Sequence, residues 1–163
     1  EDAREDLARV GSRGFEDLPR DGMLLATWIE LALAAIAQGD APHAELLLAR
    51  MRPHASEHAF DEFFFSWGAL AQYVGLLQRM LGDRTAAIES FEEAIELNAR
   101  LRHRPERLRS QLELGLTLQV GLQATARARG MQCLRSVREE AQALGLIRIA
   151  RAAEAALREA LST

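Results

Sequence analysis

Small and hydrophobic residues recur along this chain with a step of 43 residues. Each copy has a small residue, a larger apolar residue four positions later, and another apolar residue three positions beyond that. Residues spaced in this way share one face of an α-helix. The copies are Ala44, Leu48 and Met51; Ala87, Phe91 and Ala94; and Gly130, Leu134 and Val137. Three copies of one apolar helix face predict a stacked helical array. Such arrays create extended surfaces, so the pattern favours a binding function.

Turn signals between the apolar segments place the predicted helices. Gly39-Asp40 and Gly82-Asp83 each separate two segments of helical periodicity, and Pro42 stands at a tolerated first-turn position. We predict helical hairpins over about 22–52, 61–101 and 106–144, followed by an amphipathic capping helix over about 147–161. The predicted fold class is all-α: an α-solenoid in a single domain that spans residues 1–163, whose right-handed form is implied by the family resemblance given below.

The composition supports a helical domain and excludes disulfide bonds within the chain and sites that need lysine. Apolar residues make up 48% of the 163 residues and aromatic residues only 6%, which suits one helix-rich core. Cys133 is the only cysteine, so no intramolecular disulfide can form. All 20 basic residues are arginine, which excludes a lysine-based phosphate-binding loop or Schiff base.

The chain shows no segment that is expected to cross or target a membrane. Its longest apolar run, Met23–Ala37, is shorter than the roughly 20 residues that span a bilayer. The N-terminal residues carry no secretory signal pattern, and they begin without a methionine. We therefore expect a cytoplasmic chain without membrane contact that forms a segment of a larger protein.

The second predicted hairpin resembles a known repeat family. Its small residues, turn glycine and large packing residue lie at the offsets of tetratricopeptide repeats (TPR). These residues are Gly75, Gly82, Ala87, Phe91 and Ala94. The step of 43 residues exceeds the usual length of about 34, so the connections are longer than the family norm. The resemblance implies a TPR-like solenoid with a concave groove lined by the first helix of each hairpin.

A wider resemblance covers most of the chain. The segments Phe15–Asp21, Tyr73–Leu77 and Phe91–Arg100 are similar to the C-terminal repeat region of large bacterial signalling ATPases. Those proteins couple a nucleotide-binding core to a nucleotide cyclase or to a DNA-binding helix-turn-helix module. The resemblance implies a protein-interaction or scaffold segment of a bacterial signalling or transcription regulator. Since the sequence has no catalytic motif, we expect neither an enzyme nor a bound cofactor.

The repeat offsets also give candidate partner-binding residues. On the first helices of the second and third hairpins they select Gln72, Arg79, Arg109 and Gln119. A protein or peptide partner would lie in the groove, where Arg79 and Arg109 would meet its acidic groups.

An aromatic cluster offers an alternative site. Five of the eight residues from Phe60 to Trp67 are aromatic. In one interpretation, Phe63, Phe65 and Trp67 hold a small effector or a partner. In the other, Phe64 and Trp67 anchor a helix in the core. Since three consecutive phenylalanines cannot share one helix face, at least one of them should point elsewhere.

Charge is distributed unevenly. Residues 1–65 carry 13 acidic residues and 6 arginines, whereas residues 66–163 carry 11 acidic residues and 14 arginines. The segment Arg100–Arg138 holds nine arginines and two acidic residues. Such a segment suits a nucleic acid, a phosphorylated ligand or an acidic partner, but the aromatic residues of a single-strand binder are missing. We expect these arginines to pair with the acidic N-terminal half, within one chain or in a homodimer.

Two remaining features have simple interpretations. His54 and His58 are spaced to share a helix face near Glu57, but the spacing fixes no third strong ligand, so we expect no metal. Cys133 lies on a predicted packing helix without an evident base. We therefore expect Cys133 to act as a small buried packing residue rather than as a nucleophile.

Overall fold

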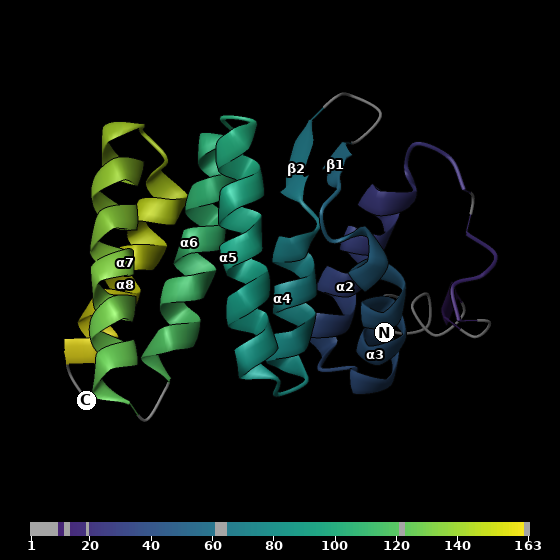
Figure 1. Cartoon of the computed structure of the whole chain (residues 1–163), viewed down its shortest axis with the longest axis horizontal. Coiled ribbons are helices and arrows are strands. Elements are labelled where there is room, and N and C mark those ends of the chain that lie inside the picture. Colours follow the sequence, from purple (N-terminus) through teal and green to yellow (C-terminus); the bar gives the residue numbers. More distant parts are fainter. Residues whose placement is uncertain (1–9, 12–13, 19, 61–64, 121–122, 162–163) are drawn as a thin grey trace. The chain divides into compact units, whose positions relative to one another are not determined.

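The computed structural model describes residues 10–11, 14–18, 20–60, 65–120 and 123–161. Over these ranges the chain is mostly helical, with seven α-helices and one short antiparallel pair of strands (Figure 1). The elements are α2 (Leu24–Gln38), α3 (Ala41–Met51), the 3₁₀ turn η1 (Arg52–His54), β1 (His58–Phe60), β2 (Ser66–Ala69), α4 (Ala71–Met80), α5 (Arg84–Arg100), α6 (Arg104–Gln119), α7 (Ala124–Ala143) and α8 (Ile147–Leu161). The all-α prediction is confirmed in its helical content, whereas the pair of strands was not predicted.

Most helix bounds agree with the sequence pattern, but the start of the second hairpin does not. The prediction of a helix from about residue 61 is wrong, because residues 66–69 form β2 and α4 begins only at Ala71. Gly68 has φ +82°, which a right-handed helix cannot contain, and aromatic residues favour strands. In the strand pairing, His58 lies opposite Ala69. Residues 61–64 lie outside the described residues.

Four helix ends share one turn geometry. A residue in the left-handed region donates its N–H to the carbonyl three residues back, and the next N–H reaches the carbonyl five residues back. This pattern is the Schellman motif, which satisfies carbonyls at the end of a helix. The left-handed residues are Gly39 (φ 65°), Gly82 (φ 89°), Arg102 (φ 57°) and Gly145 (φ 72°).

The first two of these turns also share a cap. Asp40 Oδ1 accepts a hydrogen bond from His43 N–H at 3.3 Å, and Asp83 Oδ1 accepts one from Ala86 N–H at 3.0 Å. Each aspartate satisfies a donor that the helix start would otherwise leave open. The two Gly-Asp pairs that the sequence places between helical segments therefore form turns of the same geometry.

The contacts within the chain divide it into two compact units. Unit 1 comprises Glu1–Ser90 and unit 2 comprises Phe91–Thr163, so the boundary falls inside α5.

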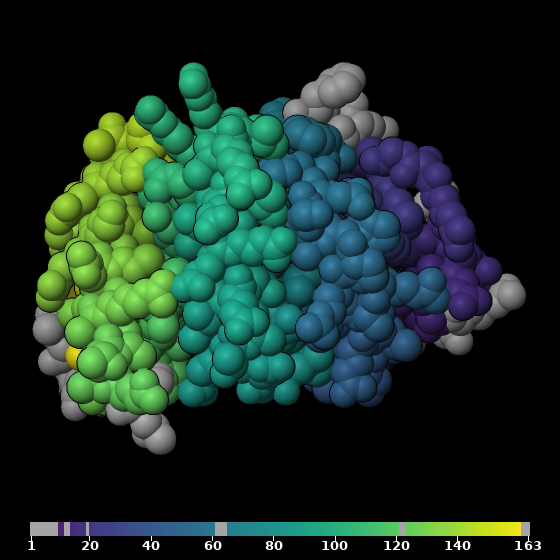
Figure 2. Space-filling model, in the orientation of Figure 1, coloured from purple at the N-terminus to yellow at the C-terminus, as the bar shows by residue number. Residues whose placement is uncertain are grey.

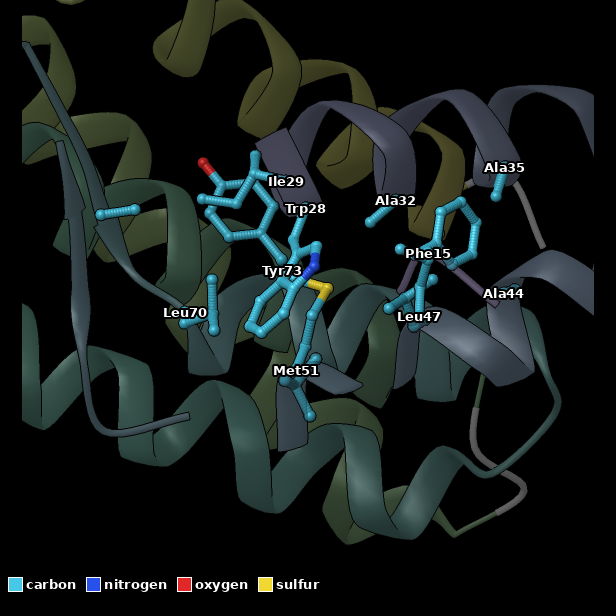
Figure 3. Close-up of a cluster of buried hydrophobic side chains, with 13 residues drawn as sticks. Phe15, Trp28, Ile29, Ala32, Ala35, Ala44, Leu47, Met51, Leu70 and Tyr73 are labelled. Carbon is cyan, nitrogen blue, oxygen red and sulfur yellow. The ribbon is translucent and has the colours of Figure 1, made fainter. Parts of the chain in front are cut away.

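In unit 1, α2, α3 and α4 each contact the other two helices. Figure 3 shows the buried side chains that these helices contribute to one cluster. The tyrosine hydroxyl of Tyr73 donates a 2.9 Å hydrogen bond to the Trp67 carbonyl and so ties β2 to α4. The fully or nearly fully buried members of the cluster include Ile29, Ala32, Ala44, Leu47, Met51, Leu70, Val74 and Leu77.

In unit 2, α6, α7 and α8 repeat the same pattern of mutual contacts. Two glycines let α6 and α7 approach closely. A Cβ atom added at Gly130 would lie 3.0 Å from the Gly115 carbonyl oxygen and 3.0 Å from Leu118 Cβ. The core around this crossing includes Leu108, Leu112, Leu134, Val137, Ala141, Ile149, Ala153 and Leu157.

The positions of the 43-residue repeat lie on α3, α5 and α7, the second helix of each predicted hairpin. Eight of the nine are buried, and the ninth, Leu48, is half-buried. The pattern therefore identifies the packing face of these three helices correctly.

The contact at Gly130 can be tested by adding one methyl group. Gly130→Ala would force α6 and α7 apart at backbone atoms, an overpacking cost of about 1–3 kcal/mol that exceeds the gain of about 0.5–1 kcal/mol from higher helix propensity. We expect a lower free energy of unfolding in urea. Gly22→Ala is the control, because nothing lies within 4 Å of its added Cβ. Equal stability of Gly130→Ala and the wild type would contradict the close contact.

Candidate binding surfaces

Aromatic side chains are exposed to solvent at the end of β1, where Phe60 lies, and just before the start of β2, where Phe65 lies. Phe65 is 70% exposed and Phe60 is 41% exposed. Figure 1 shows the two strands extending beyond the first turn of α4. Phe65 thus satisfies the expectation that one residue of the phenylalanine triplet points away from the core, whereas Phe63 and Phe64 lie outside the described residues.

Trp67 belongs to β2, which forms an antiparallel β-hairpin with β1; we call this segment, His58–Ala69, the aromatic hairpin. Trp67 is half-buried on β2 and packs against the unit 1 core, so the interpretation that it anchors a helix in the core is right about the core and wrong about the helix. Its indole Nε1–H is buried and finds no hydrogen-bond partner within the described part of the chain. The carbonyl of Trp67 accepts a hydrogen bond from the Tyr73 hydroxyl, and this bond fixes the backbone of Trp67.

Backbone hydrogen bonds fix the base of the hairpin. Leu70 N–H donates to the Glu57 carbonyl at 2.9 Å, and Ala71 N–H donates to the Ala55 carbonyl at 2.9 Å. These bonds join the segment before β1 to the start of α4. The exposed aromatic side chains are therefore carried on a segment tied to the unit 1 core.

His54 and His58 do not form a metal centre with any described neighbours. His54 Nδ1 lies 2.6 Å from Glu57 Oε1, and its ring centroid is 5.3 Å from that of Trp28. His58 opens β1. Across the described ranges, no group of three or more histidine, cysteine, aspartate or glutamate side chains is placed to hold a metal ion.

The predicted groove residues lie in different surroundings. Gln72 is only 6% exposed and offers little surface to a ligand. Arg79 is half-buried on α4. Arg109 is exposed on α6, with its guanidinium 3.7 Å from the Glu106 carboxylate. Gln119 is half-buried at the last turn of α6.

Gln119 lines a pocket of about 430 Å³ in unit 2. The pocket lies where α6 ends, between the first half of α7 and the last turns of α8. Gln119 Nε2 is buried and makes no hydrogen bond to any described residue. The other lining residues are Leu116, Val120, Arg127, Ala156, Glu159 and Ala160. Apolar and charged side chains meet here, which suits an amphipathic ligand or segment.

Carboxylates of unit 2 offset much of the arginine charge in Arg100–Arg138. The ion pairs found are Arg100–Glu96, Arg107–Glu140, Arg109–Glu106, Arg129–Glu92 and Arg138–Glu139. Each of these pairs has its acidic partner within residues 92–140, rather than in the acidic N-terminal half that the charge distribution predicts. The physical reason is local: a carboxylate on the same helix or on an adjacent helix lies within reach of each of these five guanidinium groups.

Cys133 sits against α6, where its Sγ donates to the Gln111 carbonyl at 3.2 Å. Burial raises the pKa of the Cys133 thiol, while Arg129 and the Gly115 backbone oppose the shift. The protonated thiol is therefore favoured over the thiolate, which argues against a nucleophilic role.

The raised pKa predicts slow alkylation of Cys133. Since only the thiolate reacts, the rate with iodoacetamide at mildly alkaline pH should fall below that of a free cysteine. The midpoint of the rate against pH should also lie above the value of a free thiol, which distinguishes the pKa effect from restricted access. Denaturing the chain should restore the ordinary rate. A midpoint at or below the free-thiol value would contradict this assignment.

No described helix combines the length and apolar character needed to cross a bilayer. Comparisons of the chain with family models, curated proteins and solved structures find no match. The function must therefore be inferred from the geometry of these surfaces.

Proposed function

We propose that this chain is a protein-interaction module, built as a TPR-like right-handed α-solenoid of three helical hairpins plus a capping helix. Three observations support the repeat interpretation. The 43-residue pattern marks the buried face of α3, α5 and α7. The turns at Gly39 and Gly82 share their hydrogen bonds and aspartate caps. The helix triplets α2–α3–α4 and α6–α7–α8 have the same mutual contacts.

The observation that carries the proposed function is the exposure of Phe60 and Phe65 on the hairpin. Large aromatic side chains supply much of the binding energy of protein interfaces when a partner removes them from water. Because the base of the hairpin is hydrogen-bonded to the helical core, little ordering is required on binding. The chemistry that fits is an apolar segment of a partner protein.

A small-effector sensor is the second candidate. It is favoured by the buried Nε1–H of Trp67, which lacks an acceptor among the described residues. A ligand with a carbonyl or similar acceptor would satisfy this donor. The wider proposal, a cytoplasmic scaffold of a bacterial signalling or transcription regulator, rests on the resemblance of the repeat region to signalling ATPases.

The proposed function can be tested with a double variant, Phe60→Ala with Phe65→Ala. A partner captured from the source organism would be purified, and its affinity for the wild-type chain and each variant measured by calorimetry. Removing two exposed aromatic anchors should weaken binding by about a hundredfold, since an anchor contributes about 1–2 kcal/mol or more. The melting temperature should change little.

Two further variants separate the alternatives. Leu144→Ala with Ile147→Ala removes comparable apolar surface elsewhere, because these residues are 39% and 62% exposed, and should leave affinity unchanged. Trp67→Phe removes the indole N–H but keeps an aromatic ring, so it should impair a small effector more than a protein. Unchanged partner affinity in the phenylalanine double variant, with loss in Arg79→Ala and Arg109→Ala, would point to the groove instead.

A further inference from the structure

A second surface of unit 2 is lined by arginines. A pocket of about 330 Å³ opens at the turn from α5 to α6, and Asn98, Ala99, Arg102, Arg104 and Arg107 line it. Asn98 is fully buried, and its side-chain nitrogen donates to Ser110 Oγ at 3.4 Å. Long side chains project from the surface near this turn in Figure 2. We call this site the arginine pocket.

The charge of the arginine pocket is only partly compensated. Arg107 pairs with Glu140 and donates to Gln111. Arg102 and Arg104 are exposed, and their guanidinium groups make no ion pair or hydrogen bond with any residue that the structure describes. No acidic residue is part of the lining. Two positive charges therefore face a pocket that holds no counter-charge of its own.

The backbone at Arg102 is one that glycine adopts more easily than arginine. Of the four Schellman turns, three have glycine at the left-handed position, and only this one has a residue with a Cβ. A non-glycine residue at φ 57° is strained relative to glycine. Strain of this kind persists only where the surrounding structure compensates for it, and it is concentrated at binding and active sites. Here the strained residue is one of the two uncompensated arginines.

The start of α6 adds to the positive field. Its N-cap residue, His103, makes no side-chain cap hydrogen bond. Arg104 and Arg107 both belong to the first turn of this 16-residue helix. The partial positive charge of a helix N-terminus and the guanidinium groups therefore act on the same volume.

We propose that the arginine pocket binds the phosphate group of a phosphomonoester, carried by a small molecule or by a phosphorylated side chain. Guanidinium groups bind phosphate through paired, charge-assisted hydrogen bonds. A phosphomonoester carries a charge of about −1.5 to −2 near neutral pH, which matches the two uncompensated arginines better than one carboxylate does. The lining contains no aromatic side chain on which a nucleic-acid base would stack. The site is independent of the aromatic hairpin in unit 1.

The test is an NMR titration of the full chain labelled with ¹⁵N. The probes are inorganic phosphate, phosphoserine, and a short peptide with one phosphoserine, each compared with sodium chloride at equal ionic strength. The unphosphorylated peptide and sodium acetate serve as further controls. We expect saturable amide shifts that cluster in residues 98–107 with the phosphate probes. Tighter binding of the phosphopeptide than of phosphoserine would identify a protein ligand, and equal binding would identify a small molecule.

Arg102→Gly is the decisive variant, because glycine suits the left-handed backbone. It should keep or raise the melting temperature while weakening phosphate binding by about tenfold, the usual effect of losing one charge-assisted interaction. Arg104→Gln should weaken binding similarly. Arg148→Ala, which removes an exposed arginine of α8, should have no effect.

Three results would overturn the proposal. These are shifts with phosphate no larger than with chloride, equal phosphate affinity in Arg102→Gly and the wild type, or loss of binding in Arg148→Ala to the same extent. Stronger binding of a non-phosphorylated oligonucleotide with internal phosphodiesters than of the phosphate probes would also overturn it, in favour of a nucleic-acid site.

Discussion

The close approach of helices at small residues is the constraint on which the packing of this chain depends. In unit 2 the backbone of α6 at Gly115 contacts that of α7 at Gly130, and neither position has room for a Cβ atom without movement. Because the axes approach so closely, Leu134 and Val137 reach full burial, and α8 can cover the same core. In unit 1 the fully buried Ala32 and Ala44 belong to the corresponding core of α2 and α3.

The turns make this packing reproducible along the chain. The Schellman geometry reverses the chain within a few residues, so consecutive helices lie antiparallel and adjacent. Glycine is the usual residue at the left-handed position, and aspartate caps follow it in the first two turns. The turn at Arg102 keeps the backbone but changes the residue. The other three turns only join helices, whereas this turn also places a charged side chain, Arg102, on the protein surface.

The two candidate sites arise in different ways. The β-hairpin of β1 and β2 interrupts the helical pattern. Its two strands of three and four residues contact α2 and α4, while Phe60 and Phe65 stay exposed. The arginine pocket arises within the pattern, at a helix junction where the neighbouring arginines Arg100 and Arg109 already have carboxylate partners. Exposed apolar area suits a protein partner, whereas uncompensated charge in a concave site suits an anion.

The amino-acid sequence by itself determined α2, α3 and α5, the turns at Gly39 and Gly82, and the buried face of α3, α5 and α7. These features depend on periodicity, glycine and capping residues, which act over a few neighbouring positions. It also indicated that Cys133 is a packing residue. The strand Ser66–Ala69 was decided only by the tertiary structure, since it depends on pairing with His58–Phe60 and on the bond from Leu70 to Glu57. Which arginines remain without a carboxylate was likewise decided there, because Glu140 reaches Arg107 from another helix, while no described acidic side chain reaches Arg102 or Arg104.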